Sequence, residues 1–353
     1  MGEKQWFAAG VIAAVAFGGQ LLAQQLTDRR QLEKIEQTLR QEGQAVVALA
    51  DAAADNESVP RDVPIDWHND FLKAQSGTFV PFIVRIVPPP KAEAALLYVR
   101  VTRRTAEPAQ KPARRRGDVA FVTYAFEEIF PIDLAGSRGE PVRVARGFSL
   151  ASGEYDVTVV VRERATDRGR ARLAGVLRRP LSVPDFQSGE LTTSTVMMAD
   201  RLTVLGQIPG TDELRDRPYV VAGREIQLAP DTVFHQDEEL IVVFLVYNPV
   251  VTPDKQFDLE VEYHFFRKSG LGEGYFNRTE PQRFTPASLG PQYDPSAGHP
   301  VMAGQGVPLA GFQEGDYRLA IKVTDLISGR SISREVRFTV RPRGGLGAAR
   351  VDL

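Results

Sequence analysis

The side chains best suited to chemistry in this sequence include four histidines that stand far apart along the chain. They are His68, His235, His264 and His299. None has a second histidine at the His-x-x-x-His spacing that brings two imidazoles to one metal ion. His264 shares the polar side of an expected strand with Glu260 and Glu262, because side chains alternate along a strand. This trio could hold a metal, but the simpler interpretation is a solvated polar face.

Three further segments come close to known motifs without completing them. Gly147-Phe148-Ser149-Leu150-Ala151 lacks the last glycine of a nucleophile elbow and no helix follows it. Gly270-Leu271-Gly272-Glu273-Gly274 does not open a helix, so we expect a turn there and not a nucleotide cradle. Asp237-Glu238-Glu239 could approach calcium, but the ligand spacing of an EF-hand loop is missing. The sequence therefore predicts a protein that is not an enzyme and has no metal and no cofactor.

Two surfaces are candidates for binding a partner. The first is a dense basic cluster on an expected polar loop, made of Lys111, Arg114, Arg115 and Arg116. Such a cluster can attract an anionic lipid, a polysaccharide or an acidic protein, or it can simply keep the loop solvated. The second is the aromatic pair Tyr275-Phe276. The net charge of −2 argues against a nucleic-acid partner for the whole chain.

The elements that would position these side chains are strands, and one strand pattern occurs twice. Tyr155, Val157, Val159 and Val161 alternate behind Gly153, and Tyr317, Leu319, Ile321 and Val323 alternate behind Gly315. A Gly-x-Tyr entry to a late strand resembles the tyrosine corner of immunoglobulin-like sandwiches. We therefore interpret Tyr155 and Tyr317 as structural corners; the alternative is that both are ordinary aromatics at strand edges.

Two earlier segments repeat at the same offset of 162 residues. Phe82-Ile83-Val84 corresponds to Phe244-Leu245-Val246, and Leu97, Val99 and Val101 correspond to Leu259, Val261 and Tyr263. Three segments at one offset indicate two copies of one domain. The predicted fold is all-β, with two tandem sandwiches of the immunoglobulin or fibronectin III type behind a signal or anchor segment and a helix.

The expected organisation follows from composition along the chain. We expect a signal peptide or membrane anchor over 1–23, a helix and linker over 24–62, sandwiches over 63–183 and 190–341, a hinge over 184–189 and a flexible tail over 342–353. In the hinge, Phe186 is expected either to wedge between the domains or to face solvent. A strand is expected over Val119–Tyr124, a turn over Lys268–Gly274 and a long loop over Gln282–Gly306.

The N-terminus indicates the compartment. Lys4 precedes an apolar run, and Leu21-Leu22-Ala23 offers a cleavage point, as in a signal peptide. We expect export to the periplasm or cell surface, with attachment to the inner membrane only if the leader stays uncleaved. The chain has no cysteine, so disulfides and thiol chemistry are excluded. The helix expected over 28–55 has heptad-like apolar spacing, which suits either a spacer lying on the first sandwich or a homodimer through 28–55.

Three motifs carry a family resemblance. Trp67-His68-Asn69-Asp70-Phe71-Leu72-Lys73, Val183-Pro184-Asp185-Phe186 and Gly315-Asp316-Tyr317-Arg318-Leu319 resemble the C-terminal region of secreted bacterial proteins related to von Willebrand factor A. The A domain of those proteins has no counterpart in this sequence, and neither has its Asp-x-Ser-x-Ser metal motif. The resemblance implies tandem β-sandwiches in an envelope protein. We therefore expect a structural or protein-binding module whose partner is another envelope protein, or alternatively a module that binds carbohydrate or another surface polymer.

Overall fold

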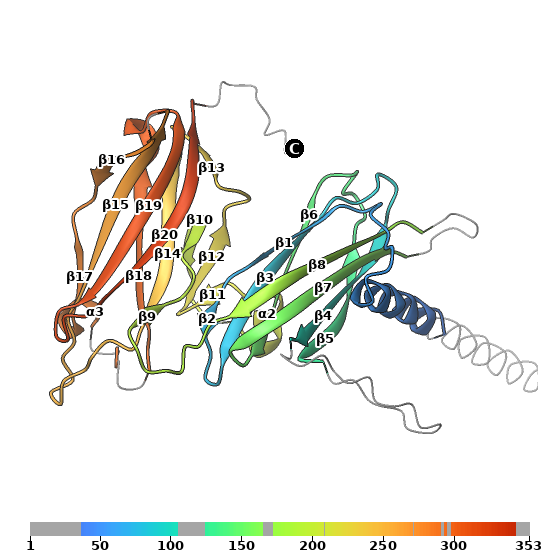
Figure 1. Ribbon diagram of the computed structural model, residues 1–353, viewed down its shortest axis with the longest axis horizontal. Coiled ribbons are helices and arrows are strands. Elements are labelled where there is room, and N and C mark those ends of the chain that lie inside the picture. The colour runs from blue at the N-terminus through green and yellow to red at the C-terminus, as the bar shows by residue number, and fades with distance from the viewer. Residues whose placement is uncertain are drawn as a thin grey trace, which may run out of the picture. The chain divides into compact units, whose positions relative to one another are not determined.

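The computed structural model describes residues 37–104, 124–164, 172–207, 209–270, 272–290, 293–294 and 298–343. The chain is an all-β protein of tandem immunoglobulin-like sandwiches preceded by a helix, which confirms the predicted fold class (Figure 1). It divides into two compact units. The first comprises the described parts of Met1–Asp66, Ile86–Val142 and Asp156–Arg179, and the second those of Trp67–Arg85, Arg143–Tyr155 and Pro180–Leu353.

The first unit is built on one antiparallel sheet, here called sheet A. Its strand order is β5-β4-β7-β8, with β4 at Ala94–Arg103, β5 at Phe126–Asp133, β7 at Gly153–Glu163 and β8 at Ala174–Val183. Strand β4 is buried on both faces, from Ala95 to Val101. A strand that is buried on both faces has apolar residues at consecutive positions, and other elements must pack against each of its faces.

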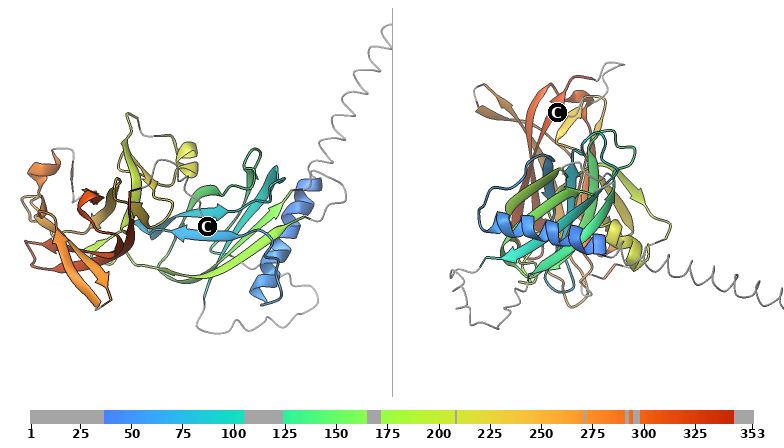
Figure 2. Two further views of the ribbon diagram at one scale, coloured as in Figure 1. Left: turned by 90° about the horizontal axis from the view of Figure 1, so that it is seen from above. Right: turned by 90° about the vertical axis from the view of Figure 1, so that its right-hand side faces the viewer.

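The N-terminal helix, residues 37–54, supplies one of these covers. Val46 and Ala50 are fully buried against Leu96, Tyr98 and Val160 of sheet A, and Figure 2 shows the helix lying across the sheet. The helix thus packs on its own sheet as a spacer would. The part of the predicted helix before residue 37 lies outside the described residues, and the homodimer through 28–55 stays a prediction.

Two buried charges fix the helix to sheet A. The Arg100 guanidinium is only 4% exposed and donates to Asp51 of the helix at 2.6 Å and to the Tyr98 hydroxyl at 2.7 Å. Glu42 of the helix is 3% exposed and accepts from Arg164 Nε at 2.9 Å. Burial of Tyr98, reinforced by the Glu127 carboxylate, raises the pKa of its phenol. In each pair one partner is buried and the other is partly exposed, and losing the exposed partner would leave the buried charge uncompensated.

The second unit contains three sheets. Sheet B has the order β1-β3-β2, and β6 also pairs with β3; β1 is Ile65–Asn69, β2 Leu72–Lys73, β3 Thr78–Ile86 and β6 Val142–Leu150. The rings of Trp67, Phe82 and Phe148 stack on one face of it, with 4.4 Å between the Trp67 and Phe82 centroids.

Sheet C has the order β11-β12-β10-β14-β18, and β9 also pairs with β14. Its strands are β9 Thr192–Thr193, β10 Met197–Val204, β11 Val220–Val221, β12 Arg224–Leu228, β14 Glu239–Tyr247 and β18 Val301–Pro308.

Sheet D has the order β13-β20-β19-β15-β16, and β17 also pairs with β15. Its strands are β13 Val233–His235, β15 Leu259–Ser269, β16 Gly272–Arg278, β17 Gln282–Phe284, β19 Gly315–Asp325 and β20 Ser331–Arg341. Three short helices join them: α2 Thr211–Asp216, α3 Pro286–Leu289 and the 3₁₀ turn η2 Leu309–Gly311.

Sheets C and D enclose one apolar core. It takes Leu240, Val242, Phe244 and Val246 from β14, and Tyr317, Leu319, Ile321 and Val323 from β19. Each set comes from alternate positions of its strand, as expected for one face of a sheet. The order β4-β7-β8 in sheet A is repeated as β15-β19-β20 in sheet D. This shared order, at the offset seen in the sequence, is what two copies of one domain require.

The paired tyrosines make the same bond in both copies. The Tyr155 hydroxyl donates to the Ala151 carbonyl at 3.0 Å, and the Tyr317 hydroxyl donates to the Gln313 carbonyl at 2.8 Å. Both rings are 2% exposed. The glycines that open the two strands, Gly153 and Gly315, have φ angles of 145° and 147°. This left-handed backbone favours glycine, so each corner depends on the glycine as well as on the tyrosine of its Gly-x-Tyr motif.

The predicted turn at Lys268–Gly274 is present in narrower bounds, at Gly270 between β15 and β16, whose ends Ser269 and Gly272 pair. The predicted loop Gln282–Gly306 was wrong, because that segment contains β17, α3 and most of β18. Strand β18 carries glycines at 304 and 306, which disfavour a strand locally. It nevertheless pairs with β14 from Glu239↔Pro308 to Val246↔Val301, all but the last residue of that strand. Long-range pairing overrides local propensity there.

Strand β5 was missed because two glutamates and a proline interrupt its pattern. Of the predicted strand Val119–Tyr124, all but the last residue lies outside the described residues, as do the leader and 344–353 of the tail. Among the described residues, no helix combines the length and the apolar character that crossing a bilayer requires.

The equivalence of the two corners can be measured. Tyr155→Phe and Tyr317→Phe should each lower the free energy of unfolding by about 1 kcal/mol, the net value of one hydrogen bond. Urea unfolding of the full chain, followed by circular dichroism, would give both values. Tyr275→Phe is the matched control: this tyrosine is 60% exposed, and its loss should stay within about 0.5 kcal/mol. Unequal losses at the two corners would contradict their equivalence.

Candidate partner-binding groove

The predicted partner-binding residues separate in the structure. The basic cluster Lys111, Arg114, Arg115 and Arg116 lies outside the described residues. Tyr275 is 60% exposed on β16, with its ring edge-on to Phe266 at 5.9 Å between centroids. Phe276 points to the other face and packs against Phe312 and Tyr317 at 4.9 and 5.3 Å. Phe276 is thus partly buried against the core, and Tyr275 is the more exposed residue of this pair.

The titratable groups singled out in the sequence are engaged in local contacts. His264 Nε2 lies 3.6 Å from Glu262, which also pairs with Lys322 at 3.1 Å. The hydrogen bond from Lys322 lowers the pKa of Glu262. The Glu238 carboxylate accepts from the backbone N–H of His235 at 2.7 Å. Within the described part of the chain, no three histidine, aspartate or glutamate side chains converge as metal ligands would.

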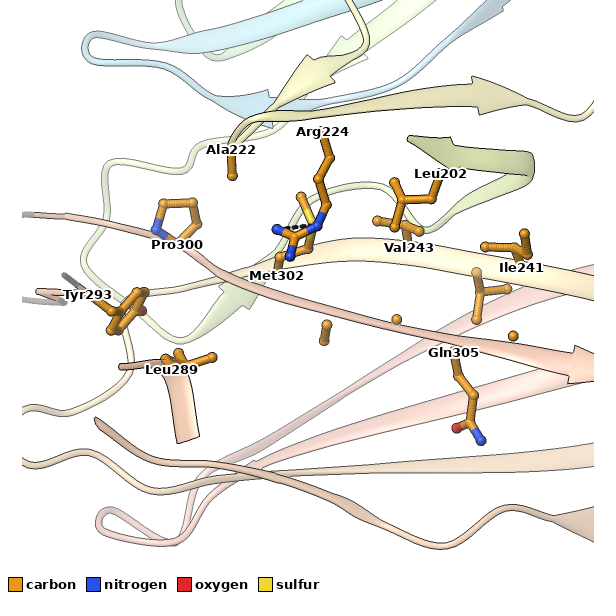
Figure 3. A pocket seen from close by; sticks show the side chains of 14 residues that line it. Leu202, Ala222, Arg224, Ile241, Val243, Leu289, Tyr293, Pro300, Met302 and Gln305 are labelled. Carbon is orange, nitrogen blue, oxygen red and sulfur yellow. Dashed lines mark hydrogen bonds between the residues drawn. The ribbon is translucent and has the colours of Figure 1, made fainter. Parts of the chain in front are cut away.

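A groove runs over the face of sheet C that points away from the core. Its first cavity encloses about 460 Å³. Apolar side chains from three strands form its walls: Leu202 of β10, Ile241 and Val243 of β14, and Met302 of β18. Figure 3 shows Arg224 reaching into it between Pro300 on one side and Leu202 and Ile241 on the other. The volume falls within the range of small-ligand pockets, about 300–1,000 Å³.

A second cavity of about 750 Å³ adjoins the first, since Ala222 and Pro300 line both. Its apolar wall consists of Leu72, Phe79, Leu245 and Tyr247. Ser149, from the incomplete elbow motif, also lines it. This serine lies within strand β6, whereas a nucleophile elbow places its serine on a turn between strand and helix. Among the described residues that line either cavity there is no histidine, aspartate or glutamate.

The hairpin β11–β12 positions Arg224, the positively charged side chain of the first cavity. Val221 pairs with Arg224 across a two-residue turn, Ala222-Gly223. Both turn residues have positive φ, 48° and 73°, as in the type I′ turns that match strand twist. The turn brings Arg224 over the groove, where its Nη1 lies 3.8 Å from the Met302 sulfur. The neighbouring Arg217 is already paired with Glu225 at 2.9 and 2.7 Å, and this pairing lowers the pKa of Glu225.

Hydrogen bonds from residues 70–73 hold the wall of the second cavity. The backbone N–H of Phe71 donates to Thr195 Oγ1 at 2.9 Å, and the N–H of Lys73 donates to the Tyr247 hydroxyl at 3.0 Å. Residues of the predicted hinge, 184–189, pack against the same wall. Phe186 is 2% exposed, with its ring 5.4 Å from that of Tyr247, and Thr78 Oγ1 donates to the Pro184 carbonyl at 2.7 Å. Phe186 is therefore buried and does not face solvent.

A buried carboxylate lies at the centre of this assembly. Asp70 is 1% exposed, and its Oδ2 accepts from the Tyr219 hydroxyl at 3.0 Å. His68 Nε2 lies 3.0 Å from the same oxygen. Burial and the negative charge of Asp70 raise the pKa of Tyr219, so its proton stays in the hydrogen bond. Asp70 and Tyr219 thereby link β1 and β2 to the hairpin that carries Arg224.

Sequence reasoning missed the groove because its walls come from segments far apart in the chain. One signal was present. Leu240–Tyr247 is apolar at every position, and such a strand must be covered on both faces. The sequence thus indicated a second covered face, but it did not reveal which segments would cover it or where the cover would stop.

Comparisons with known proteins assign no family. No family model matches the chain, and no curated protein matches it. Among solved structures, a red sea bream transglutaminase is similar at a TM-score of 0.21 and 12% identity, over 82% of this chain and 33% of that one. A trypsin-activated α-2-macroglobulin from Escherichia coli is similar at a TM-score of 0.21 and 9% identity, over 80% of this chain and 17% of that one. Similarity at this level carries no inference about function.

Removing the bond to the buried carboxylate should cost more than removing a corner bond. Tyr219→Phe should lower the free energy of unfolding by about 2 kcal/mol, because a hydrogen bond to a charged group contributes about 1.5–3 kcal/mol. Urea unfolding, with Tyr155→Phe as the neutral-acceptor reference, would measure the difference. A loss no larger than that of Tyr155→Phe would contradict the role assigned to Asp70.

Proposed function

We propose that this chain is an exported, non-enzymatic module of tandem immunoglobulin-like sandwiches that binds a partner protein through the groove on sheet C. The observation that carries the proposal is the pair of adjoining cavities, about 460 and 750 Å³, whose walls are partly apolar and whose described lining residues include no histidine, aspartate or glutamate. Histidine and carboxylate side chains are the commonest general acids and bases in catalysis. Binding needs only complementary shape and polarity.

The rim of the groove also suits a protein partner. Val204 is 72% exposed and is the register partner of Arg224 on the neighbouring strand. An exposed aliphatic side chain that borders a partly apolar groove is typical of an interaction site. Pro218 and Pro300 line the second cavity.

The proposed compartment rests on the N-terminal sequence pattern. Its basic start, apolar run and small residues at a cleavage point support export to the periplasm or the cell surface. The partner would then be another envelope protein. The resemblance to the sandwich region of von Willebrand factor A-related proteins points to the same environment. Membrane attachment depends on whether the leader remains, and a homodimer through 28–55 would use helix residues other than Val46 and Ala50, which pack on sheet A.

Leu202 is a partly buried residue of the groove wall at which the groove can be blocked. Leu202→Lys places a long charged side chain at the wall of the first cavity. We expect the tagged full chain to retain a specific envelope protein from a membrane-and-periplasm extract, and Leu202→Lys to reduce that retention at least tenfold. Quantitative mass spectrometry of the retained proteins measures this.

Thr203→Lys is the matched control, because Thr203 is exposed on the same strand and lines neither cavity. It should retain the partner at the level of the unmodified chain. Equal retention by both variants would show that the groove is not the binding site. Substrate turnover by the purified chain would contradict the non-enzymatic assignment.

A carbohydrate-binding module is the second candidate, and one observation favours it. Tyr275 is exposed beside Phe266, whose ring is covered by the Arg318 guanidinium at 4.2 Å. An aromatic ring flanked by paired charges can stack on a sugar. Arg318 pairs with Glu273 and Glu335 on the same face of sheet D.

A glycan array separates the two candidates. If sheet D binds a surface polymer, the full chain should bind at least one glycan class, and Tyr275→Ala should abolish that signal while Leu202→Lys leaves it intact. An array without signal, or a signal insensitive to Tyr275→Ala, would remove this alternative.

A further inference from the structure

Three arginines of the first unit gather at one end of the N-terminal helix. Arg164 Nε lies 2.9 Å from Oε2 of the buried Glu42, and Arg172 Nη1 lies 3.8 Å from Oε1 of the same carboxylate. Arg162 shares the helix-facing side of β7 with Val160, which packs on the helix, because side chains alternate along a strand. Arg162, Arg164 and Arg172 are here called the arginine cluster.

The arginine cluster has too few acids around it. Among the described residues, Glu42 is the only carboxylate within ion-pair distance of any of the three guanidinium groups. Glu163, which lies between Arg162 and Arg164, alternates to the other face of β7 and accepts from the Leu173 N–H at 3.4 Å. Three guanidinium groups against one carboxylate leave an excess of two positive charges at this end of the helix.

Two further observations agree with this excess. Burial and, after it, the positive charge of Arg172 lower the pKa of Arg162, as expected for a cation with another cation close by. The segment 165–171 has two arginines and one aspartate in its sequence, so its composition does not cancel the excess. A guanidinium binds a phosphate through two parallel N–H bonds. The arginine cluster is therefore suited to a partner that carries phosphate groups.

An exposed leucine lies on the same side of the helix. Leu39 is 45% exposed and stands three residues before Glu42, so both lie on one helix face. It continues the stripe of Val46 and Ala50 beyond the part that packs on sheet A. An apolar side chain beside excess cations suits the surface of a bilayer, where the apolar group enters below the headgroups and the cations stay among them.

The place of the arginine cluster in the chain favours a membrane over other phosphate-bearing partners. Residues 24–36 alone separate the apolar leader from the described start of the helix at residue 37. That segment can reach about 20 Å as a helix and about 45 Å when extended. A leader that stays in the bilayer therefore holds the arginine cluster close to lipid headgroups. A tether of this length raises their effective concentration into the millimolar range, where weak binding suffices.

We propose that the arginine cluster docks the first unit on an anionic membrane surface when the leader remains in the bilayer. Arg162 and Arg172 bind the phosphate groups of anionic lipids, Arg164 keeps its bond to Glu42, and Leu39 inserts among the headgroups. Each arginine near an anionic surface strengthens binding about fivefold, so two excess charges give about 25-fold. This inference concerns a different surface from the groove on sheet C and does not depend on it.

Contact quenching in nanodiscs tests the proposal on the full chain. Because the chain has no cysteine, Gln41→Cys, exposed on the helix beside Glu42, gives a single site for a fluorophore. The labelled chain is reconstituted through its leader in nanodiscs of phosphatidylcholine alone or of phosphatidylcholine and phosphatidylglycerol in equal parts, with a nitroxide on the headgroups. We expect the ratio of docked to undocked protein to be at least tenfold higher with phosphatidylglycerol. High salt should remove this preference, since it screens exposed charges.

A double substitution separates the arginine cluster from general charge. Arg162→Gln/Arg172→Gln should abolish the preference, because it removes the excess charge and leaves the bond of Arg164 in place. The matched control is Arg179→Gln/Arg201→Gln, which removes the same charge from two exposed arginines outside the arginine cluster. It should keep the preference.

Both double variants should melt at the temperature of the labelled parent. If the cluster variant melts lower, Arg172→Gln alone, at an exposed position, repeats the test with an expected loss of about fivefold. Equal docking in the two lipids, a preference that survives loss of the cluster charges, or the same loss in the control would overturn the inference.

Inorganic phosphate is the competing probe. If it abolishes the preference at unchanged ionic strength, the arginines form a site for a single phosphate ion, and the membrane assignment is overturned. The preference should persist in its presence if the surface responds to a layer of headgroups. Since this readout involves no envelope partner, its failure leaves the proposed function standing, and failure of Leu202→Lys to reduce partner retention leaves this inference standing.

Discussion

The structure of the second unit depends on one constraint: strand β14 is apolar on both faces. Leu240, Val242, Phe244 and Val246 enter the core between sheets C and D. Val243, Leu245 and Tyr247 point the other way and pack with Leu72, Phe186 and Tyr219 in a separate cluster. Removing both faces of a strand from water is favourable, by about 25 cal/mol for each Å² of apolar surface. The chain must therefore bring other segments over the second face.

The groove is the part of that face where the cover stops. Residues 70–73, Phe186 and the β11–β12 hairpin cover Leu245 and Tyr247, and the buried bond between Asp70 and Tyr219 fixes them in place. Ile241 and Met302 are only partly covered. Arg224 projects over this uncovered part from the hairpin. One packing requirement thus explains both the tight assembly around Phe186 and the open cavity beside it.

The first unit meets the same requirement in a different way. Strand β4 is also apolar on both faces, and the N-terminal helix covers one of them through Val46 and Ala50. Val47 and Leu49 pack beside them, and the charged contacts Glu42–Arg164 and Asp51–Arg100 add polar links between the helix and the sheet. The two repeats share a strand order, yet different elements pack on the second apolar face of β4 and of β14.

Local pattern predicted most of the sheet architecture and little of the candidate site. Periods of two over 153–162 and 315–323 predicted β7 and β19, and the Gly-x-Tyr phrase predicted the corner geometry that both tyrosines have. The same reasoning missed β18, because Gly304 and Gly306 carry no strand signal of their own. It also assigned a binding role to Phe276, which packs in the core, since period two did not show which face of an edge strand would be buried.

The sequence by itself determined the repeat, the fold class and the absence of thiol chemistry, because alternation, offset and composition are properties of neighbouring or countable residues. Only the tertiary structure decided where a ligand could bind. The groove brings together Leu202, Arg224, Ile241 and Met302, which lie on four strands of sheet C. Their proximity depends on strand order and on which segments cover β14. Those are long-range choices made by burial and pairing, and no local pattern encodes them.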